Sequence, residues 1–464
     1  IGWVYQYFNS EDERREMRKS SAPRNSRELA VRNQFFTPRY VVEFLTDNTL
    51  GRLWYEMMQG QTALAHLDFL VRRENEVFLE PGEEPPASAG ESANNALFRK
   101  KKDPRDIKVL DPACGSGHFL LYAFDLLFTI YSEAWHDPHA ASFTQTGRTL
   151  RQDYDSEEEL QRAIPTLILE YNLCGIDIDA RAAQIAALAL WLRVQRAYRD
   201  MGLNQRERLP VKKTNIVVAE PMPGDQKLVD VFAQGLEVPM LRELFLAMIE
   251  QMQLAGEMGS LLKVDVTLEE AIGDYEEQYI ALQSRKELAL PGFEPEFEQE
   301  ELVFMGIENV DFFAEAGEVI TDALQAFTEK ATGASRVRRR LFADDATQGV
   351  AFVQLVRKRF DVVLMNPPFG AGSTRAKKVF DKAYPRTKND VFAAFVERGI
   401  ELLNPQGLLG AITSRTGFFL RSFQKWREDI LLKEAPPVVF ADLGDGVLDG
   451  AMVEVAAYCL EKIT

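Results

Sequence analysis

The stretch of sequence that decides the fold is residues 360–370, which read Phe-Asp-Val-Val-Leu-Met-Asn-Pro-Pro-Phe-Gly. The apolar run at residues 362–365 is typical of a strand that is covered on both faces of a sheet. Pro367 and Pro368 end this strand, because neither has a backbone N–H to donate to a neighbouring strand. The chain therefore leaves the sheet at the carboxyl end of the strand, where ligands bind in open α/β sheets.

The residues at this strand end suit the binding of a planar amino group. Asn366 offers its amide carbonyl oxygen, and the carbonyl oxygen of Pro367 is held rigidly because both prolines have a fixed φ. Two acceptors directed at one point hold both hydrogens of an NH2 group and stabilise the positive charge that develops when its nitrogen attacks an electrophile. Phe369 can stack on a planar base or amide beside it. The alternative is a core strand that ends in prolines and a capping Asn.

The composition is that of an ordinary globular protein. The chain has 464 residues, of which 46% are hydrophobic and 27% charged, so it is long enough for two or three domains or one domain with large insertions. Three cysteines fit a reducing compartment, and the four histidines lack the spacing of metal ligands, so we expect no metal site. No apolar run approaches the roughly 20 residues of a membrane span, so we expect a cytoplasmic protein without membrane contact.

The net charge of −17 argues at first sight against a nucleic-acid partner. Most of it arises in one segment, because residues 222–300 contain 17 acidic and 5 basic residues. Basic clusters lie elsewhere, at residues 14–24, 99–102, 336–340 and 375–388. Each cluster taken alone is more simply a solvated face than a binding site.

A second candidate site lies where a short apolar strand at residues 107–110 runs into Asp-Pro-Ala-Cys-Gly-Ser-Gly at residues 111–117. An apolar helix follows, to about residue 132. Gly115 and Gly117 allow a tight turn and a close approach of a ligand to the backbone. The pattern is not the Gly-x-Gly-x-x-Gly fingerprint of dinucleotide binding, which favours a ligand without a pyrophosphate.

The next two predicted strands each end in an acidic residue. The strand at residues 171–179 places Asp177 at its tip, where the carboxylate can accept hydrogen bonds from both hydroxyls of a ribose. Asp179 is expected to cap the Ala-rich helix at residues 181–199. The strand at residues 215–219 ends at Glu220, which can accept the exocyclic amine of an adenine.

Strands and helices alternate along the chain, which predicts an α/β fold with a Rossmann-like, doubly wound, mixed seven-stranded sheet. A hairpin at residues 438–460 is expected to close it. We expect an N-terminal helical segment at residues 1–100 that ends in a flexible loop at 81–95, a catalytic domain at 101–221 and 356–464, and a mostly helical acidic insertion at 222–355. In the first segment, Thr37 is expected to cap a helix that starts at Pro38 and extends to about residue 58.

Four motifs in this order, at residues 36–38, 111–117, 177 and 366–369, resemble the N6-adenine DNA methyltransferases of the gamma motif order. The sequence is more similar still to the large adenine-specific methyltransferases of the BREX and DISARM phage-defence systems, through residues 2–7, 48–54, 255–261 and 388–392. The resemblance runs through nearly the whole chain. It implies a bacterial or archaeal enzyme that transfers a methyl group from S-adenosylmethionine to N6 of adenine in double-stranded DNA, alone or with other defence subunits.

The resemblance also implies roles for individual residues. The catalytic residues that meet the flipped adenine are Asn366, Pro367, Pro368 and Phe369. The cofactor-binding residues are Phe36, Thr37 and Pro38 beside the methionine part, Asp111, Ala113, Gly115 and Gly117 in the turn beneath it, Asp177 and Ile178 at the ribose, and Glu220 at the adenine.

Two positions depart from the family pattern. Relatives often have Asp where this chain has Glu220, and they often place an aromatic residue in the loop at residues 444–450, where this chain offers Leu448. The target-recognition domain of the family follows the catalytic core, so we expect it after residue 464. Two alternatives use the same residues: methylation of a glutamine amide in a protein, and an inactive subunit that binds DNA or partner proteins.

Overall fold

The computed structural model describes residues 11–17, 19, 22–32, 35–72, 76–78, 96–97, 99–236, 238–268, 312–329, 334–448 and 453–463. The expectations for residues 2–7, for the loop at 81–95 and for a domain after residue 464 lie outside these residues. The sequence also predicts a helix at residues 268–290, of which only the first residue is described. The chain forms two compact units, Ile1–Ile216 with Arg359–Thr464 and Val217–Lys358.

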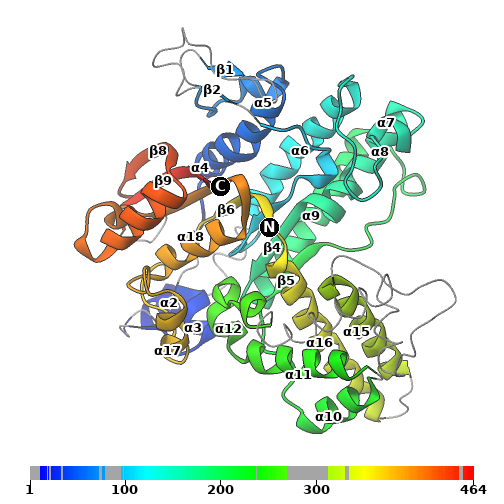
Figure 1. Ribbon diagram of the computed structural model, residues 1–464, viewed down its shortest axis with the longest axis vertical. Coiled ribbons are helices and arrows are strands. Elements are labelled where there is room, and N and C mark those ends of the chain that lie inside the picture. The colour runs from blue at the N-terminus through cyan, green and yellow to red at the C-terminus, as the bar shows by residue number, and fades with distance from the viewer. Residues whose placement is uncertain are drawn as a thin grey trace, which may run out of the picture. The chain divides into compact units, whose positions relative to one another are not determined.

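The first unit is built on a seven-stranded sheet with the strand order β5-β4-β3-β6-β7-β9-β8 (Figure 1). Its strands are β3 (Val109–Asp111), β4 (Leu173–Asp177), β5 (Asn215–Val218), β6 (Phe360–Met365), β7 (Leu403–Ser414), β8 (Pro437–Gly444) and β9 (Val455–Glu461). β3 is parallel to β4 and β6, and β6 is parallel to β7, whereas β9 is antiparallel to β7 and β8. The mixed sheet with a closing hairpin confirms the predicted fold. A separate pair of short strands joins β1 (Val77–Phe78) to β2 (Ala96–Leu97).

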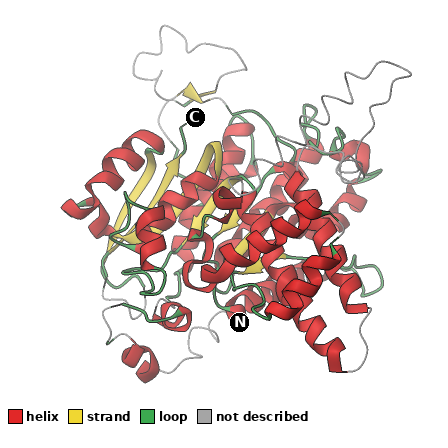
Figure 2. Ribbon diagram, turned by 60° about the horizontal axis from the view of Figure 1, so that its bottom comes forward, coloured by secondary structure: helices red, strands yellow, loops and turns green. Residues whose placement is uncertain are grey.

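Helices cover both faces of this sheet (Figure 2). The helices of the first unit, with η marking 3-10 and π helices, are α2 (Glu11–Met17), α3 (Ser26–Arg32), α4 (Arg39–Thr46), η1 (Asp47–Gly51), α5 (Arg52–Met57), η2 (Ala63–His66), η4 (Pro104–Asp106), α6 (His118–His136), α7 (Leu150–Asp153), α8 (Glu157–Leu167), η5 (Ile168–Asn172), α9 (Ala180–Asp200), α17 (Lys377–Ala383), α18 (Val391–Leu402), η8 (Arg415–Phe418), η9 (Arg421–Phe423) and η10 (Trp426–Glu434).

The central strand β6 is buried at every position, as its apolar run predicts. Val362 and Leu364 belong to a core that they share with α4 and α6. Val363 and Met365, which point to the opposite face, lie against Gly399 of α18. Alternate side chains of one strand therefore bury apolar surface in two separate layers, which is why the strand contains almost no polar residue.

Some predicted elements differ in detail from the structure. The helix predicted at residues 38–58 is α4, a π turn at η1, and α5. Thr37 does not cap it, because Pro38 occupies the cap position and no side chain bonds to the first turn. The sequence also predicts a turn at residues 404–407 and a helix near residues 419–432. The first of these is part of β7, and the second consists of η9 and the π helix η10.

Apart from the end of β5, the described part of the second unit is mostly helical. Its helices are α10 (Gln226–Gly235), α11 (Pro239–Gln251), η6 (Met252–Leu254), α12 (Ala255–Met258), η7 (Gly259–Leu261), α15 (Phe312–Glu329) and α16 (Ala334–Arg357). An aromatic cluster forms part of its core, in which Phe232 contacts Phe245, Phe327 and Phe342 with ring centroids 4.8, 5.5 and 6.0 Å apart. None of the helices in the described part of the chain has both the length and the hydropathy of a membrane span.

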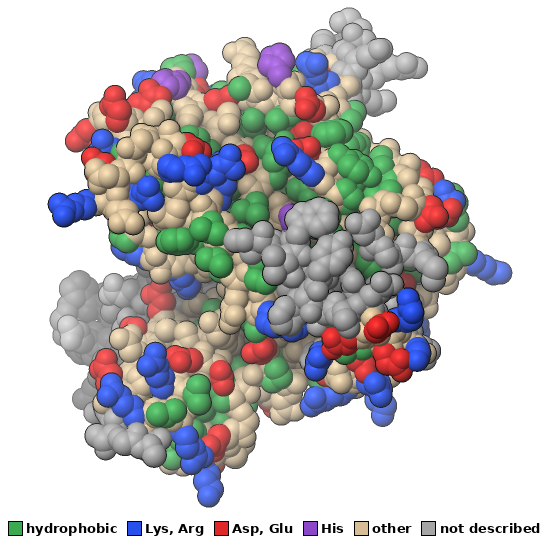
Figure 3. All heavy atoms as spheres, turned by 180° about the vertical axis from the view of Figure 1, so that it is seen from behind, with side chains coloured by type: hydrophobic (Ala, Val, Ile, Leu, Met, Phe, Trp, Pro, Cys, Tyr) green, Lys and Arg blue, Asp and Glu red, His purple; other side chains and the backbone are tan. Residues whose placement is uncertain are grey.

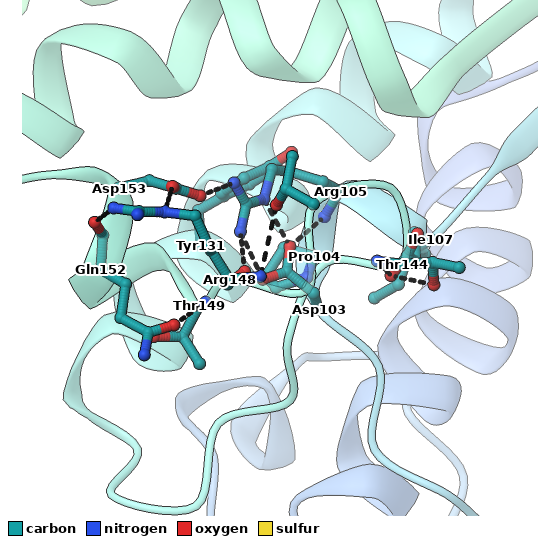
Figure 4. A network of polar contacts seen from close by, with 12 residues as sticks. Asp103, Pro104, Arg105, Ile107, Tyr131, Thr144, Arg148, Thr149, Gln152 and Asp153 are labelled. Atoms are coloured by element: carbon teal, nitrogen blue, oxygen red, sulfur yellow. Dashed lines mark hydrogen bonds and ion pairs between the residues drawn. The ribbon is translucent and has the colours of Figure 1, made fainter.

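A buried ion-pair network fixes the chain where it enters β3 (Figure 4). The Arg105 guanidinium lies 2.8 Å from Asp103 Oδ1 and 2.5 Å from Asp153 Oδ2. The side chains of Asp103 and Arg105 are 1% and 6% exposed. Removal of one partner from such a pair leaves an uncompensated buried charge. The folded state therefore depends on both partners.

We expect Arg105→Met to lower the free energy of unfolding by about 3–5 kcal/mol, because it leaves Asp103 buried without its partner. Arg148→Met is the matched control, since Arg148 contacts the same Asp153 but its side chain is 57% exposed. That control should cost less than about 1 kcal/mol. Urea denaturation measures both changes, and equal losses would contradict the assignment.

Candidate functional site

The predicted site residues of the first unit gather at one edge of the sheet. Residues 111–117 leave the end of β3, Asp177 is the last residue of β4, and Asn366 directly follows β6. The three strands are parallel neighbours. Their carboxyl ends therefore open to the same side, which is the ligand-binding edge of an open α/β sheet.

The turn after β3 has the open backbone that the sequence predicts. Gly115 and Gly117 have backbone φ angles of +52° and +83°, which residues other than glycine rarely adopt. A Cβ atom at Gly115 would meet no heavy atom within 4 Å, so a ligand can approach the backbone there. At Gly117 a Cβ atom would lie 3.2 Å from Ala186 Cβ, so the turn packs closely on α9.

Asp177 ties the end of β4 to this turn. Its Oδ2 accepts the Gly115 N–H at 2.8 Å, and its Oδ1 accepts the Asp179 N–H at 2.8 Å. An ionised carboxylate has about four acceptor positions, so Asp177 can also accept ligand hydroxyls. Burial raises the pKa of Asp177 to about 6. Asp179 caps α9 by accepting the Arg181 N–H, as predicted.

Asp111 brings a second carboxyl group to the same turn. It is buried, and its Oδ1 accepts the Ala113 N–H at 3.2 Å. Burial raises the pKa of Asp111 well above its ordinary value, and the negative charge of Asp177 raises it further. Two neighbouring acids in one turn favour a ligand that offers hydroxyl or amino donors over one that carries a phosphate.

The side chain of Asn366 is held by a hydrogen bond that links distant parts of the chain. Its Nδ2 donates to Thr37 Oγ1 at 3.0 Å, and Thr37 is buried. The Thr37 hydroxyl, which does not cap α4, therefore serves as an acceptor for Asn366. With its NH2 group engaged, the amide presents its carbonyl oxygen to another donor.

Neighbouring rings connect the same segment to both strand ends. Phe36 contacts His118 edge to face, with centroids 4.7 Å apart, and His118 is the first residue of α6 after the glycine turn. The ring centroids of Phe35 and Phe369 lie 6.0 Å apart. Sequence reasoning missed Phe35 and His118 as site residues, although each directly adjoins a predicted motif.

Asp390 fixes the backbone that follows Phe369. Its Oδ1 accepts the Gly370 N–H at 2.8 Å and the Phe392 N–H at 3.2 Å, and the Val391 N–H donates to the Gly370 carbonyl at 2.9 Å. The sequence assigned no role to Asp390, which lies within the segment 388–392 that carries the resemblance. An Asp directly before an apolar helix is a helix-cap signal that could have identified it.

Not every predicted residue joins this arrangement. Glu220 follows β5, falls in the second unit and is exposed, so its role stays a prediction. Leu448 is 2% exposed and packs in the hydrophobic core, so it does not replace an exposed stacking aromatic. Pro367 is buried. The three other predicted catalytic residues, Asn366, Pro368 and Phe369, are half-buried. Across the described ranges, no group of three or more His, Cys, Asp or Glu residues has the arrangement of a metal site.

Two curated proteins match the chain over its whole length. The Adenine-specific methyltransferase BrxX of Escherichia coli O9:H4 is 28% identical over 477 residues, and the Adenine-specific methyltransferase PglX of Lacticaseibacillus casei is 26% identical over 473 residues. The matched regions are 33% and 32% of those proteins, so the chain spans about a third of their length. These matches confirm the resemblance that the sequence motifs indicate.

Two solved complexes are similar at lower identity. The DrdV–DNA complex has 12% identity and a TM-score of 0.42, and covers 99% of this chain and 29% of that one. The Type ISP restriction-modification enzyme LlaGI in complex with a DNA substrate mimic has 10% identity and a TM-score of 0.40, and covers 92% of this chain and 23% of that one.

Two family descriptions match the sequence itself. Residues 88–222 match the DNA-methyltransferase domain of MmeI. Residues 171–441, which are more than half of the chain and include β6 and the strand end at Asn366, match the Eco57I restriction-modification methylases. The chain therefore belongs to the Eco57I restriction-modification methylase family.

Proposed function

We propose that this chain carries the catalytic part of a methyltransferase that methylates N6 of adenine in double-stranded DNA. The observation that best supports this proposal is the hydrogen bond from Asn366 to Thr37. It joins the segment at residues 36–38 to a strand end whose acceptors suit an aromatic amine. The two curated proteins that match the whole of this chain are named as adenine-specific methyltransferases, which supports adenine as the target base. In this proposal residues 101–221 and 356–464 form the catalytic domain, and residues 222–355 are an insertion.

The turn after β3 fits S-adenosylmethionine as the cofactor. The backbone at Gly115 is open to a ligand, and Asp177 has acceptor capacity for the two ribose hydroxyls. The ionised carboxylate of Asp177 suits a ligand that carries a sulfonium and an ammonium group. Residues 36–38 adjoin the same turn through the contact of Phe36 with His118, which suits them to the methionine part. We assign Ile178 to the ribose and Glu220 to the adenine amine.

The residues after β6 then hold and activate the target amine. When bound, the cofactor supplies an electrophilic methyl group. Asn366 Oδ1 and the Pro367 carbonyl accept the two N6 hydrogens, which draws the nitrogen toward tetrahedral geometry and stabilises the positive charge that develops on it. Phe369 stacks on the base, which must first leave the duplex at a cost of a few kcal/mol. The amine loses one of its protons to solvent after transfer.

We further propose a restriction-modification or phage-defence setting in a bacterial or archaeal cytoplasm, with other defence subunits as candidate partners. The test is methylome sequencing of a host that expresses the full-length protein with its neighbouring genes. N6-methyladenine should appear at a recurring sequence and should be absent when Asn366→Ala is expressed. Methyl groups found on protein glutamine instead of DNA would overturn the proposal.

Asn366→Ala should lower the rate constant of methyl transfer by about 100-fold or more, because it removes an acceptor that acts on charge developing in the transition state. The cofactor Kd should stay close to that of the parent, since the side chain of Asn366 is engaged by Thr37 and not by the glycine turn. Single-turnover methylation and calorimetry measure the two quantities. Full activity of the variant would exclude the assigned role.

Thr37→Val should lower kcat by about 5-fold to 10-fold, because one hydrogen bond that orients the Asn366 amide is worth roughly 1 kcal/mol. Thr37→Ser is the matched control, since it keeps the hydroxyl and should restore most of kcat. KM for the cofactor should change less than kcat in both variants. A loss that Ser does not rescue would mean that packing of the Thr37 methyl group, and not its hydroxyl, matters.

Cofactor affinity should fall as the pH drops through about 6, because burial raises the pKa of Asp177 to about 6 and protonation removes an acceptor for the ribose. The fall should approach tenfold per pH unit well below the pKa. A raised pKa in the folded state favours folding at low pH, and this contribution is lost as the pH rises through the folded value, so unfolding through Asp177 does not explain the loss of affinity.

Calorimetry from about pH 8 to about pH 5 measures this pH dependence. Asp177→Asn is the control, and it should bind the cofactor weakly with little dependence on pH. An unchanged pH profile in Asp177→Asn would assign the titration to another group, of which Asp111 is the nearest candidate.

A further inference from the structure

A second surface feature stands at the same sheet edge as Asn366. β7 pairs with β6 so that Ala411 lies beside Met365, and β7 then continues to Ser414. At about 3.3 Å per residue, the strand extends about 10 Å beyond the level of Met365. The turn at residues 415–423, formed by η8 and η9, therefore projects beyond the strand end that carries Asn366.

Two adjacent apolar side chains occupy the tip of this turn. Phe419 is 68% exposed and Leu420 is 51% exposed. The turn beneath them is fixed, because Arg427 Nη1 donates to the Gly417 carbonyl at 2.7 Å and to the Leu420 carbonyl at 2.8 Å. Gly417 also lies against the buried ring of Trp426. A rigid turn that displays two large apolar side chains indicates a contact surface.

Exposed cations lie close to this tip along the chain, and the Arg415 guanidinium, which pairs with Asp442 and Glu454, lies 5.9 Å from the centroid of the Phe419 ring. Lys388, Arg421 and Lys425 are exposed, and none of them forms an ion pair with a residue that the structure describes. Asn389 Nδ2 donates to the Ser422 carbonyl at 2.6 Å, which places Lys388 near Arg421. Figure 3 shows acidic and basic side chains interspersed over one face of the molecule, so charge alone does not mark a site. The combination of exposed cations with an apolar tip is the distinguishing feature of this turn.

The turn is connected to the strand end of β6 by packed rings. Phe392 stacks on Phe423 with centroids 5.3 Å apart and contacts Phe369 at 6.4 Å. A ligand that contacts Phe419 and Leu420 is therefore positioned relative to Phe369 through these packed rings. The exposed cations beside the tip favour a polyanion as the partner, because most of the net negative charge of the chain arises in residues 222–300 and the turn lies outside them.

We propose that Phe419 and Leu420 form a wedge that inserts between stacked bases of double-stranded DNA, while Lys388, Arg421 and Lys425 contact its phosphates. This inference rests on the proposed function, because it takes duplex DNA as the substrate. Apolar side chains that enter a base step unstack it and kink the duplex. A kink at this sheet edge lowers the cost of extruding the target base toward Asn366, because unstacking is part of that cost.

The first arm of the test separates the wedge from the phosphate contacts. Full-length protein is titrated with mixed genomic duplex fragments at several salt concentrations, and unwinding is read from the linking number of a plasmid relaxed by topoisomerase in its presence. The double variant Phe419→Ala with Leu420→Ala should keep the salt dependence of binding but lose most of the unwinding. Leu432→Ala is the matched control, because Leu432 is 67% exposed on η10 and should leave both readouts unchanged. Phe419→Trp should retain unwinding.

The second arm tests the phosphate contacts proposed for the exposed cations. Lys388→Ala with Arg421→Ala should weaken DNA binding by about tenfold or more and lower the slope of log affinity against log salt by about 2, since each phosphate contact contributes roughly 0.9. Lys212→Ala with Lys213→Ala removes the same charge from exposed residues that precede β5, and it should leave that slope unchanged.

The outcomes distinguish this inference from the proposed function. If the parent methylates adenine but the Phe419/Leu420 variant unwinds DNA as the parent does, the wedge is wrong and the methyltransferase stands. If the parent binds and unwinds DNA through the wedge but transfers no methyl group, the wedge stands and the proposed function is wrong. A variant that loses only a protein partner, with DNA binding and unwinding intact, would also overturn the wedge.

Discussion

The hydrogen bond between Asn366 and Thr37 is the interaction on which the site depends. It joins residues that are 329 positions apart in the chain. On one side of it, the segment at residues 35–38 contacts the first residue of α6 through Phe36 and His118. On the other side, the loop after Phe369 is fixed by the carboxylate of Asp390. The strand end of β6 is thus held by two polar contacts, and a ring contact connects it to the start of α6.

These polar contacts explain how side chains at the end of the apolar strand β6 become oriented. β6 is buried on both faces and can place a residue at its end but cannot orient a side chain there. Orientation requires a polar partner, and the nearest ones come from loops and helix starts. Burial of Thr37 also keeps water away from its hydroxyl, which strengthens the bond to the Asn366 amide.

Much of the fold could be predicted from the sequence, because each strand is a local pattern. The apolar run at residues 362–365, the glycines at 115 and 117 and the cap at Asp179 all act within a few residues, and the structure confirms the elements that they predict. The contacts of Thr37 with Asn366 and of Asp390 with Gly370 could not be predicted in the same way. Both Thr37 and Asp390 have ordinary local uses as helix caps, and these contacts depend on the tertiary fold. The π turns at η1 and η10 have no sequence pattern that distinguishes them from α-helix.

The parallel pairing of β3 with β6 has a consequence for how the protein is made. Val109 lies beside Val362, so the centre of the sheet cannot close until the roughly 250 residues between them have been synthesised. At about 5–20 residues per second, a ribosome leaves the edge of β3 exposed for roughly ten seconds or more. During that interval this edge is open to mispairing or to capture by a chaperone. The same order of events means that a nascent chain that ends before β6 cannot bring the three strand ends together.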